Sequence, residues 1–132
     1  GGRTRDGVTN SVQIYDARTK TVVDAPSMHT PRYGFTSLRL PDGRIWVSGG
    51  CRDSYSVAGD STVEIYDPGT DTWSDGGEME HARWQHSSVM IDEDKILIIG
   101  GWAGPKVCEV YSLTTRRSVE TAEFPYISSF GK

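Results

Sequence analysis

The chain has 132 residues, of which 36% are hydrophobic, and its formal net charge at pH 7 is −4. This length suits one small domain or part of a larger one, and no apolar run approaches the roughly 18 residues of a membrane span. The 14 basic residues are scattered along the chain, whereas nucleic-acid binding normally requires a basic stripe, so neither a membrane span nor a nucleic-acid partner is expected.

The predicted elements, taken in chain order, are short β-strands that recur. Tyr66-Asp67 repeats Tyr15-Asp16 at an offset of 66 − 15 = 51 residues, and residues 12–50 align over 63–101 without a gap. In this alignment 13 of the 39 pairs are identical. Internal repeats of this period are typical of solenoids, propellers and arrays. No stretch shows a sustained helical period, so a helical repeat is not expected.

Each complete repeat unit contains four strand-like pieces. Residues 1–25 supply the last two strands of one unit, residues 33–75 form a complete unit, residues 84–120 form another, and residues 126–132 begin a further one. In the first complete unit a Pro-Asp-Gly hairpin turn at residues 41–43 precedes an apolar strand that stops at a glycine pair. Four strands in a unit of about 50 residues indicate a propeller blade.

The order of the shared residues resembles the kelch repeat. A Tyr-Asp pair is followed by a Trp six or seven residues later, a Met, an Arg, and an apolar strand that closes on Gly-Gly. The likeness covers essentially the whole chain, although the Trp73 position holds Val22 in the first copy and Ser118 in the third. It implies an all-β fold, a kelch-type β-propeller of four-stranded antiparallel blades, present as a partial ring. The remaining blades are expected from a longer parent chain or from other copies.

The residues that recur are interpreted as structural. Glycines at the end of an apolar strand allow close packing or a positive φ, aromatic rings fill the space between sheets, and the repeat arginines are expected to brace carbonyls or acids at the blade junctions. These structural residues are Tyr15, Arg32, Gly49, Gly50, Tyr66, Trp73, Arg83, Gly100, Gly101 and Tyr111.

Binding residues are expected in loops, because loops on a rigid scaffold carry most recognition. By the family resemblance, one propeller face displays the residues that follow the glycine pair and those that follow the repeat arginine. These candidate partner-binding residues are Arg3, Tyr33, Cys51, Arg52, Trp84, Gln85 and Trp102. Arginine and aromatic side chains are typical of protein-binding hot spots, although Trp84 in particular could instead fill a gap between blades. The long loop at residues 52–61 either reaches over this face or only connects two strands.

The resemblance implies an adaptor that holds a protein or peptide, with actin or a ubiquitin-ligase substrate as candidate partners. No catalytic residue, cofactor or metal is expected, and the three histidines, His29, His81 and His86, are interpreted as surface residues. The enzyme alternative is a copper-radical oxidase that resembles galactose oxidase. Tyr66 and Trp102 match positions of that family, but its cysteine would fall near residues 34–35, which are Gly-Phe.

The redox state of the two cysteines would indicate in which cellular compartment the protein resides. Cys51 and Cys108 lack the spacing of a zinc site and are interpreted as a reduced pair in a cytoplasmic protein. The alternative is a secreted structural propeller in which they form a disulfide.

Overall fold

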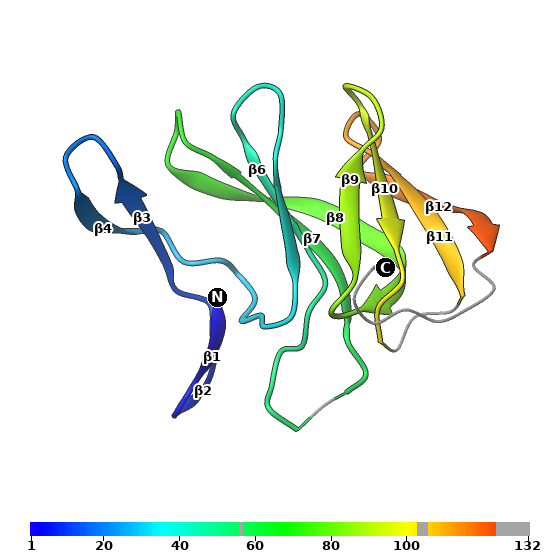
Figure 1. Ribbon diagram of the computed structural model, residues 1–132, viewed down its shortest axis with the longest axis horizontal. Helices are drawn as coiled ribbons and strands as arrows, with labels where there is room; N and C mark the ends of the chain where they lie inside the picture. The colour runs from blue at the N-terminus through cyan, green and yellow to red at the C-terminus, as the bar shows by residue number, and fades with distance from the viewer. Residues whose placement is uncertain (56, 103–105, 124–132) are drawn as a thin grey trace.

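The computed structural model describes residues 1–55, 57–102 and 106–123, and the secondary structure of these residues is entirely β (Figure 1). The predicted all-β fold is therefore confirmed. In this part of the chain there is no helix long and apolar enough to cross a membrane. The expected start of a further blade at residues 126–132 lies outside the described residues.

The N-terminal part forms two small antiparallel pairs. Strand β1 (Gly2–Thr4) pairs with β2 (Gly7–Thr9), and β3 (Val12–Asp16) pairs with β4 (Thr21–Ala25). We call β3 and β4 the first strand pair. Two strands were expected within residues 1–25, and the structure has four there.

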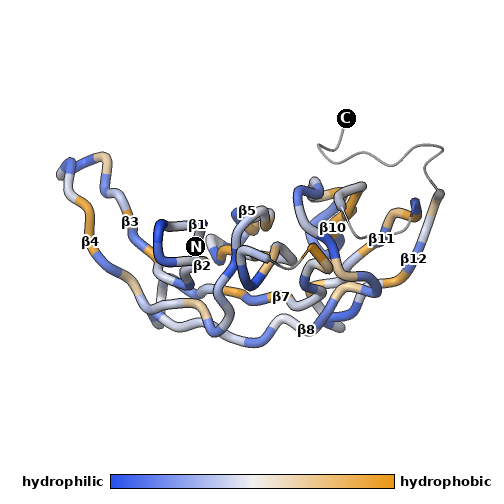
Figure 2. The backbone as a smooth tube through the Cα atoms, turned by 90° about the horizontal axis from the view of Figure 1, so that it is seen from below, coloured by the Kyte–Doolittle hydropathy of each residue, from blue (hydrophilic) through white to orange (hydrophobic). Residues whose placement is uncertain are grey.

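Two four-stranded antiparallel units follow, each in the form of a propeller blade. The strands of the middle blade are β5 (Thr36–Arg39), β6 (Ile45–Ser48), β7 (Asp60–Asp67) and β8 (Thr72–Arg83). The strands of the last blade are β9 (Ser87–Met90), β10 (Lys95–Ile99), β11 (Val107–Ser112) and β12 (Arg117–Glu123). Strand β8 continues past residue 75, where the blade was expected to end, and makes one parallel contact with β12. Viewed from below, the strands follow an arc from β4 to β12, with β5 and β10 on its inner side (Figure 2).

The outer hairpins show that the copies are structurally equivalent. The repeat tyrosines occupy the same register, with Tyr15 opposite Val22, Tyr66 opposite Trp73, and Tyr111 opposite Ser118. The turn of each hairpin contains one non-glycine residue with positive φ, namely Lys20 (58°), Asp71 (55°) and Arg116 (55°). Recurrence of this left-handed position in three turns shows that the turn type is repeated even though the residue changes.

The main core lies between the middle and last blades. Its buried cluster consists of Leu40, Trp46, Val63, Ile65, Met79, Ile96, Ile98 and Tyr111. The rings of Trp46 and Tyr111 are fully buried and their centroids lie 5.4 Å apart. The Tyr111 hydroxyl donates to the Gly76 carbonyl at 2.6 Å, so the polar end of the ring is satisfied while its apolar body fills the space between blades.

Candidate functional site

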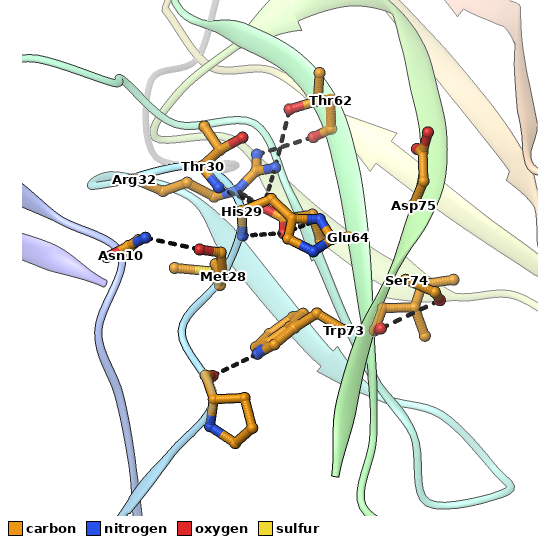
Figure 3. Close-up of polar contacts among 12 residues, drawn as sticks. Asn10, Met28, His29, Thr30, Arg32, Thr62, Glu64, Trp73, Ser74 and Asp75 are labelled. Atoms are coloured by element: carbon orange, nitrogen blue, oxygen red, sulfur yellow. Dashed lines mark hydrogen bonds and ion pairs between the residues drawn. The ribbon is translucent and has the colours of Figure 1, made fainter. Parts of the chain in front are cut away.

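Two buried arginines hold the chain in place where it passes from one blade to the next. Arg32 donates to Glu64 Oε2 from Nη2 at 2.8 Å and from Nε at 3.1 Å, and its Nη1 donates to the Thr62 carbonyl at 3.0 Å (Figure 3). The same Nη1 donates to the Gly49 carbonyl at 2.9 Å. Trp73 Nε1 also donates to the carbonyl of Pro26 at 2.8 Å. These bonds tie the segment before Arg32 to the middle blade.

Arg83 repeats this arrangement one blade on. Its Nε donates to Glu109 Oε2 at 2.8 Å, and its guanidinium also donates to the carbonyls of Gly100 (2.9 Å) and Val107 (2.6 Å). Both arginine side chains are fully buried, as is Glu109. The acidic partners were missed in the sequence analysis. Their signal was a glutamate at the same strand position in two copies, preceding the tyrosine by two residues.

The arginine braces bring the two predicted sets of loop residues together. Tyr33 and Cys51 form a backbone bridge, with N–H···O distances of 3.1 and 2.8 Å. Trp84 and Trp102 form the equivalent bridge, with distances of 3.3 and 2.8 Å. In each blade, the residue after the repeat arginine therefore lies beside the residue after the glycine pair.

Four of these side chains form a row that crosses the blades. The guanidinium of Arg3 lies 5.8 Å from the Tyr33 ring centroid, which is within cation–π range. Tyr33 meets Trp84 edge-on at 6.0 Å, and Trp84 stacks on Trp102 at 6.3 Å. We call the surface formed by Arg3, Tyr33, Trp84 and Trp102 the loop face. Trp102 is 51% exposed, so the row offers apolar area to solvent.

The described part of the long loop between β6 and β7 runs along the lower edge of Figure 1. Trp84 Nε1 donates to the Val57 carbonyl at 3.2 Å. Tyr55 in this loop is 96% exposed. The loop therefore packs against Trp84 at one point and extends an aromatic side chain into solvent.

Three of the expected binding residues differ from the others in how they are placed. Cys51 is 1% exposed, so its side chain lies beneath the loop face, and burial raises the pKa of its thiol. Arg52 forms an ion pair with Asp60, whose side chain is buried. Gln85 has a positive φ of 53°, and its N–H donates to the Gly34 carbonyl at 2.6 Å.

The Arg52–Asp60 pair is part of the scaffold beneath the face. Burial raises the pKa of Asp60, but hydrogen bonds from Arg52 and Thr62 outweigh burial and hold that pKa below its usual value. Thr62 donates to Asp60 Oδ1 from its backbone N at 2.7 Å and from its hydroxyl at 2.6 Å. The Arg52 guanidinium is therefore paired with the Asp60 carboxylate, although the Arg52 side chain remains 57% exposed.

The expectation that all three histidines lie on the surface is wrong for His86. His86 is 5% exposed, its Nε2 lies 2.9 Å from Ser48 Oγ, and its Nδ1 has no partner among the described residues. Burial, with a contribution from the charge of Arg83, lowers its pKa to about 3. His29 and His81 lie at the surface beside Glu64 and Glu120. Among the described residues no three His, Cys, Asp or Glu side chains gather as metal ligands would.

Tyr66, which matched a position of the oxidase family, makes contacts within its own outer hairpin. The Tyr66 hydroxyl donates to Asp71 at 2.5 Å, and its ring packs on Trp73 at 5.3 Å between centroids. Tyr66 is 6% exposed. The contacts with Asp71 and Trp73 are sufficient to explain why a tyrosine occurs at position 66 of the outer hairpin.

Comparison with known proteins agrees with the repeat architecture. The family model of the kelch motif matches residues 31–80. An F-box/kelch-repeat protein of Arabidopsis thaliana is 34% identical over 104 residues, covering 76% of this chain and 26% of the relative. A second is 30% identical over 122 residues (82% of this chain, 31% of the relative), and a third is 38% identical over 73 residues (55% and 21%). The chain thus spans less than a third of each of these relatives.

Proposed function

Because this chain belongs to the kelch-repeat family, we propose that it is a protein-binding scaffold that holds a partner protein or peptide against the loop face. The observation that carries the proposal is the row from Arg3 through Tyr33 and Trp84 to Trp102, which draws its members from successive blades. A partner that lies across the row contacts several blades at once.

The chemistry of the row supports binding of protein rather than of a small charged ligand. Tryptophan, tyrosine and arginine are the side chains most enriched in binding hot spots. The backbone beneath them is held by the buried Arg32 and Arg83 braces. A preorganised surface loses little conformational entropy when a partner binds, which favours affinity.

The finer proposal is that the partner is a substrate presented to a ubiquitin ligase. Its support is the F-box in the names of the relatives. Actin, the other partner considered from the sequence, has no such support in those names. We also propose a cytoplasmic location, which is supported by two free and buried thiols, Cys51 and Cys108, because a reducing compartment preserves thiols.

The proposal is tested by selecting peptides from a display library on the wild-type chain and measuring their affinity for two variants. Trp102→Ala removes the most exposed aromatic side chain of the row, and a hot spot of this kind contributes about 2 kcal/mol or more. Binding is therefore expected to fall at least about 30-fold. Val119→Ala is the matched control, because Val119 is 62% exposed on β12 and lies outside the row.

Thermal unfolding of each variant separates binding from stability, and the midpoints of both should stay near that of the wild type. If the selected peptides bind Trp102→Ala as tightly as they bind the wild type, the loop face is not the binding surface.

A further inference from the structure

A groove lies between the middle and last blades, where their hairpin turns come together. Its volume is about 590 Å³, and ligand-binding clefts are commonly about 300–1,000 Å³. The β5–β6 and β9–β10 turns that border it lie at the upper edge of Figure 1, opposite the edge along which the loop between β6 and β7 runs. We call it the turn groove. Both blades are complete four-stranded units, so both sides of the groove belong to finished parts of the fold.

One part of the turn groove is apolar. Leu40 and Pro41 line it from the β5–β6 turn, and Leu113 lines it from the β11–β12 turn. Leu40 belongs to the main core, and Leu113 is half-buried against that core. The groove therefore reaches the outer margin of the core, where an aliphatic chain can exclude water from these side chains.

Asp94 holds two turns of the last blade together at the groove. Its Oδ1 accepts from the backbone N–H and the hydroxyl of Thr114 at 2.8 and 2.6 Å, and its Oδ2 accepts from Ser112 Oγ at 2.8 Å. Its backbone carbonyl accepts from the Leu113 N–H at 2.8 Å. These bonds fix Leu113 relative to the β9–β10 turn. The groove thus exists before a partner arrives, which lowers the entropic cost of binding.

Glu93 is the carboxylate of the turn groove that no cation neutralises within the described residues. Asp42 pairs with Arg44 at 2.8 Å, and Asp94 pairs with Lys95 at 2.9 Å. Glu93 also lines the groove and is exposed, and it forms no ion pair in the described part of the chain. Its carboxylate is therefore available to a cation from outside.

The acidic side of the groove is particular to this blade junction. The β9–β10 turn reads Asp-Glu-Asp at residues 92–94, whereas the equivalent residues of the middle blade, 41–43, read Pro-Asp-Gly. One turn therefore carries three carboxylates where the other carries one. With only Lys95 paired to this turn, the β9–β10 side of the groove keeps a net negative charge.

The combination of apolar wall and free carboxylate selects the kind of occupant. Phosphate groups are repelled by the carboxylates, so a nucleic acid does not fit. A hard metal ion needs several oxygen ligands, and no three suitable side chains gather among the described residues. A lysine or arginine fits both features, because its aliphatic stem covers apolar surface while its charged head stays at the edge.

We propose that the turn groove binds a basic segment of a partner protein. One lysine or arginine side chain of that segment lies along Leu40 and Leu113 and pairs with Glu93 at the mouth of the groove. This surface is formed by the hairpin turns, whereas the loop face is formed by the segments after the arginines and the glycine pairs. The inference does not rest on the proposed binding at the loop face.

The test is an NMR titration of the isotope-labelled chain with the peptide acetyl-Ala-Leu-Lys-Leu-Ala-amide at low ionic strength. We expect the amide signals of Leu40, Glu93 and Leu113 to move, while those of Trp84 and Trp102 on the loop face stay in place. A peptide with glutamine in place of lysine should bind at least about threefold more weakly, because the ion pair is lost. Added salt should weaken binding of the lysine peptide.

A second peptide tests the apolar wall separately from the charge. Diaminopropionate in place of lysine keeps the cation but lacks the long aliphatic stem, so we expect binding to weaken at least about threefold. A peptide that needed only the charge would bind equally well in both forms.

A matched pair of variants tests the position of the charge. Glu93→Gln should weaken the lysine peptide at least about threefold. Glu80→Gln is the control, because Glu80 is also exposed and the charge change is the same, but Glu80 lies outside the turn groove. We expect its affinity for the peptide to equal that of the wild type. Both side chains are exposed, so thermal unfolding should be unchanged in both variants.

Several results would overturn the proposal. The first is a titration in which the groove signals do not move, and the second is equal binding of the lysine, glutamine and diaminopropionate peptides. Equal weakening by Glu93→Gln and Glu80→Gln would show that only the net charge matters. Sedimentation adds a further outcome: if the chain forms dimers that Glu93→Gln dissociates, a second copy is the occupant of the groove.

Discussion

Arg83 and Glu109 face each other with both side chains fully buried, and Arg83 Nε donates to Glu109 Oε2 at 2.8 Å. Glu109 also accepts from the Ser118 hydroxyl at 2.8 Å and from the backbone N–H of Glu80 at 2.5 Å. The carboxylate therefore links β11, β12 and the chain that enters the last blade. Arg32 and Glu64 repeat the pair one copy earlier.

Removing one member of such a pair leaves the other charged and buried. We expect Glu109→Ala to lower the free energy of unfolding by about 3–5 kcal/mol, measured by chemical denaturation. The control is Arg44→Ala, which breaks an arginine–carboxylate pair of the same 2.8 Å length whose side chains are 30% and 56% exposed. Exposed pairs contribute up to about 1 kcal/mol. Equal losses in the two variants would contradict the bracing role of Glu109.

Arg52 is expected to stabilise the chain as well as to lie near the loop face. Arg52→Ala leaves the buried Asp60 carboxylate without its cationic partner, and we expect a loss of about 1–3 kcal/mol at pH 7. The folded-state pKa of Asp60 lies below its unfolded value of about 3.9, so its contribution is present above that pH and is lost as the pH falls further. The stabilities of the wild type and the variant should therefore converge below about pH 4. A constant difference down to pH 2 would show that the effect is not ionic.

Because His86 is buried, we expect the stability of the protein to depend on pH below neutrality. Its folded-state pKa is about 3 and its unfolded value is about 6.5, so the unfolded chain binds one more proton between these values. Stability should therefore fall by about 1.4 kcal/mol for each pH unit below about 6.5. His86→Phe, which places the residue of the equivalent position Phe35 there, should remove this slope in denaturation measured from pH 7 to 4.5. If the slope persists in the variant, other groups cause it.

Gly49 tests the close approach at the blade junction. Its φ is 67°, and an added Cβ would lie 2.4 Å from the carbonyl oxygen of Arg83. We expect Gly49→Ala to lower the free energy of unfolding by more than about 2 kcal/mol, because backbone strain and a clash with backbone add. Gly43→Ala is the control, since Gly43 also has positive φ (93°) but nothing within 4 Å of the added carbon. Its cost should be about 1 kcal/mol. Similar values for both glycines would remove the clash from the explanation.

Much of the fold could be predicted from the sequence, because strand and turn patterns that recur in several copies are more reliable than those of a single segment. The alignment of residues 12–50 with 63–101 placed the strands, and the recurring Tyr66 and Arg83 marked the same positions in each copy. The resemblance to the kelch repeat, rather than the alignment, implied that residues after the arginine and after the glycine pair share one face. The Tyr33–Cys51 and Trp84–Trp102 bridges place these pairs side by side.

The sequence alone did not indicate which side chains are buried and which are paired internally. Cys51 and His86 were placed at the surface, yet they are 1% and 5% exposed. Arg52 pairs with Asp60, but its side chain remains 57% exposed, so its expected contact with a partner stays a prediction. Each residue is covered or bound by a segment whose approach depends on a neighbouring strand, loop or blade.

The sequence by itself determined the period, the strands and the residue types at each repeat position, because alternation and turn residues act over a few neighbours. Only the tertiary structure decided which charges are neutralised internally and which aromatic rings remain exposed. Those outcomes depend on how closely one sheet packs on the next, and that distance is set by side chains far apart in the chain, such as Trp46 and Tyr111.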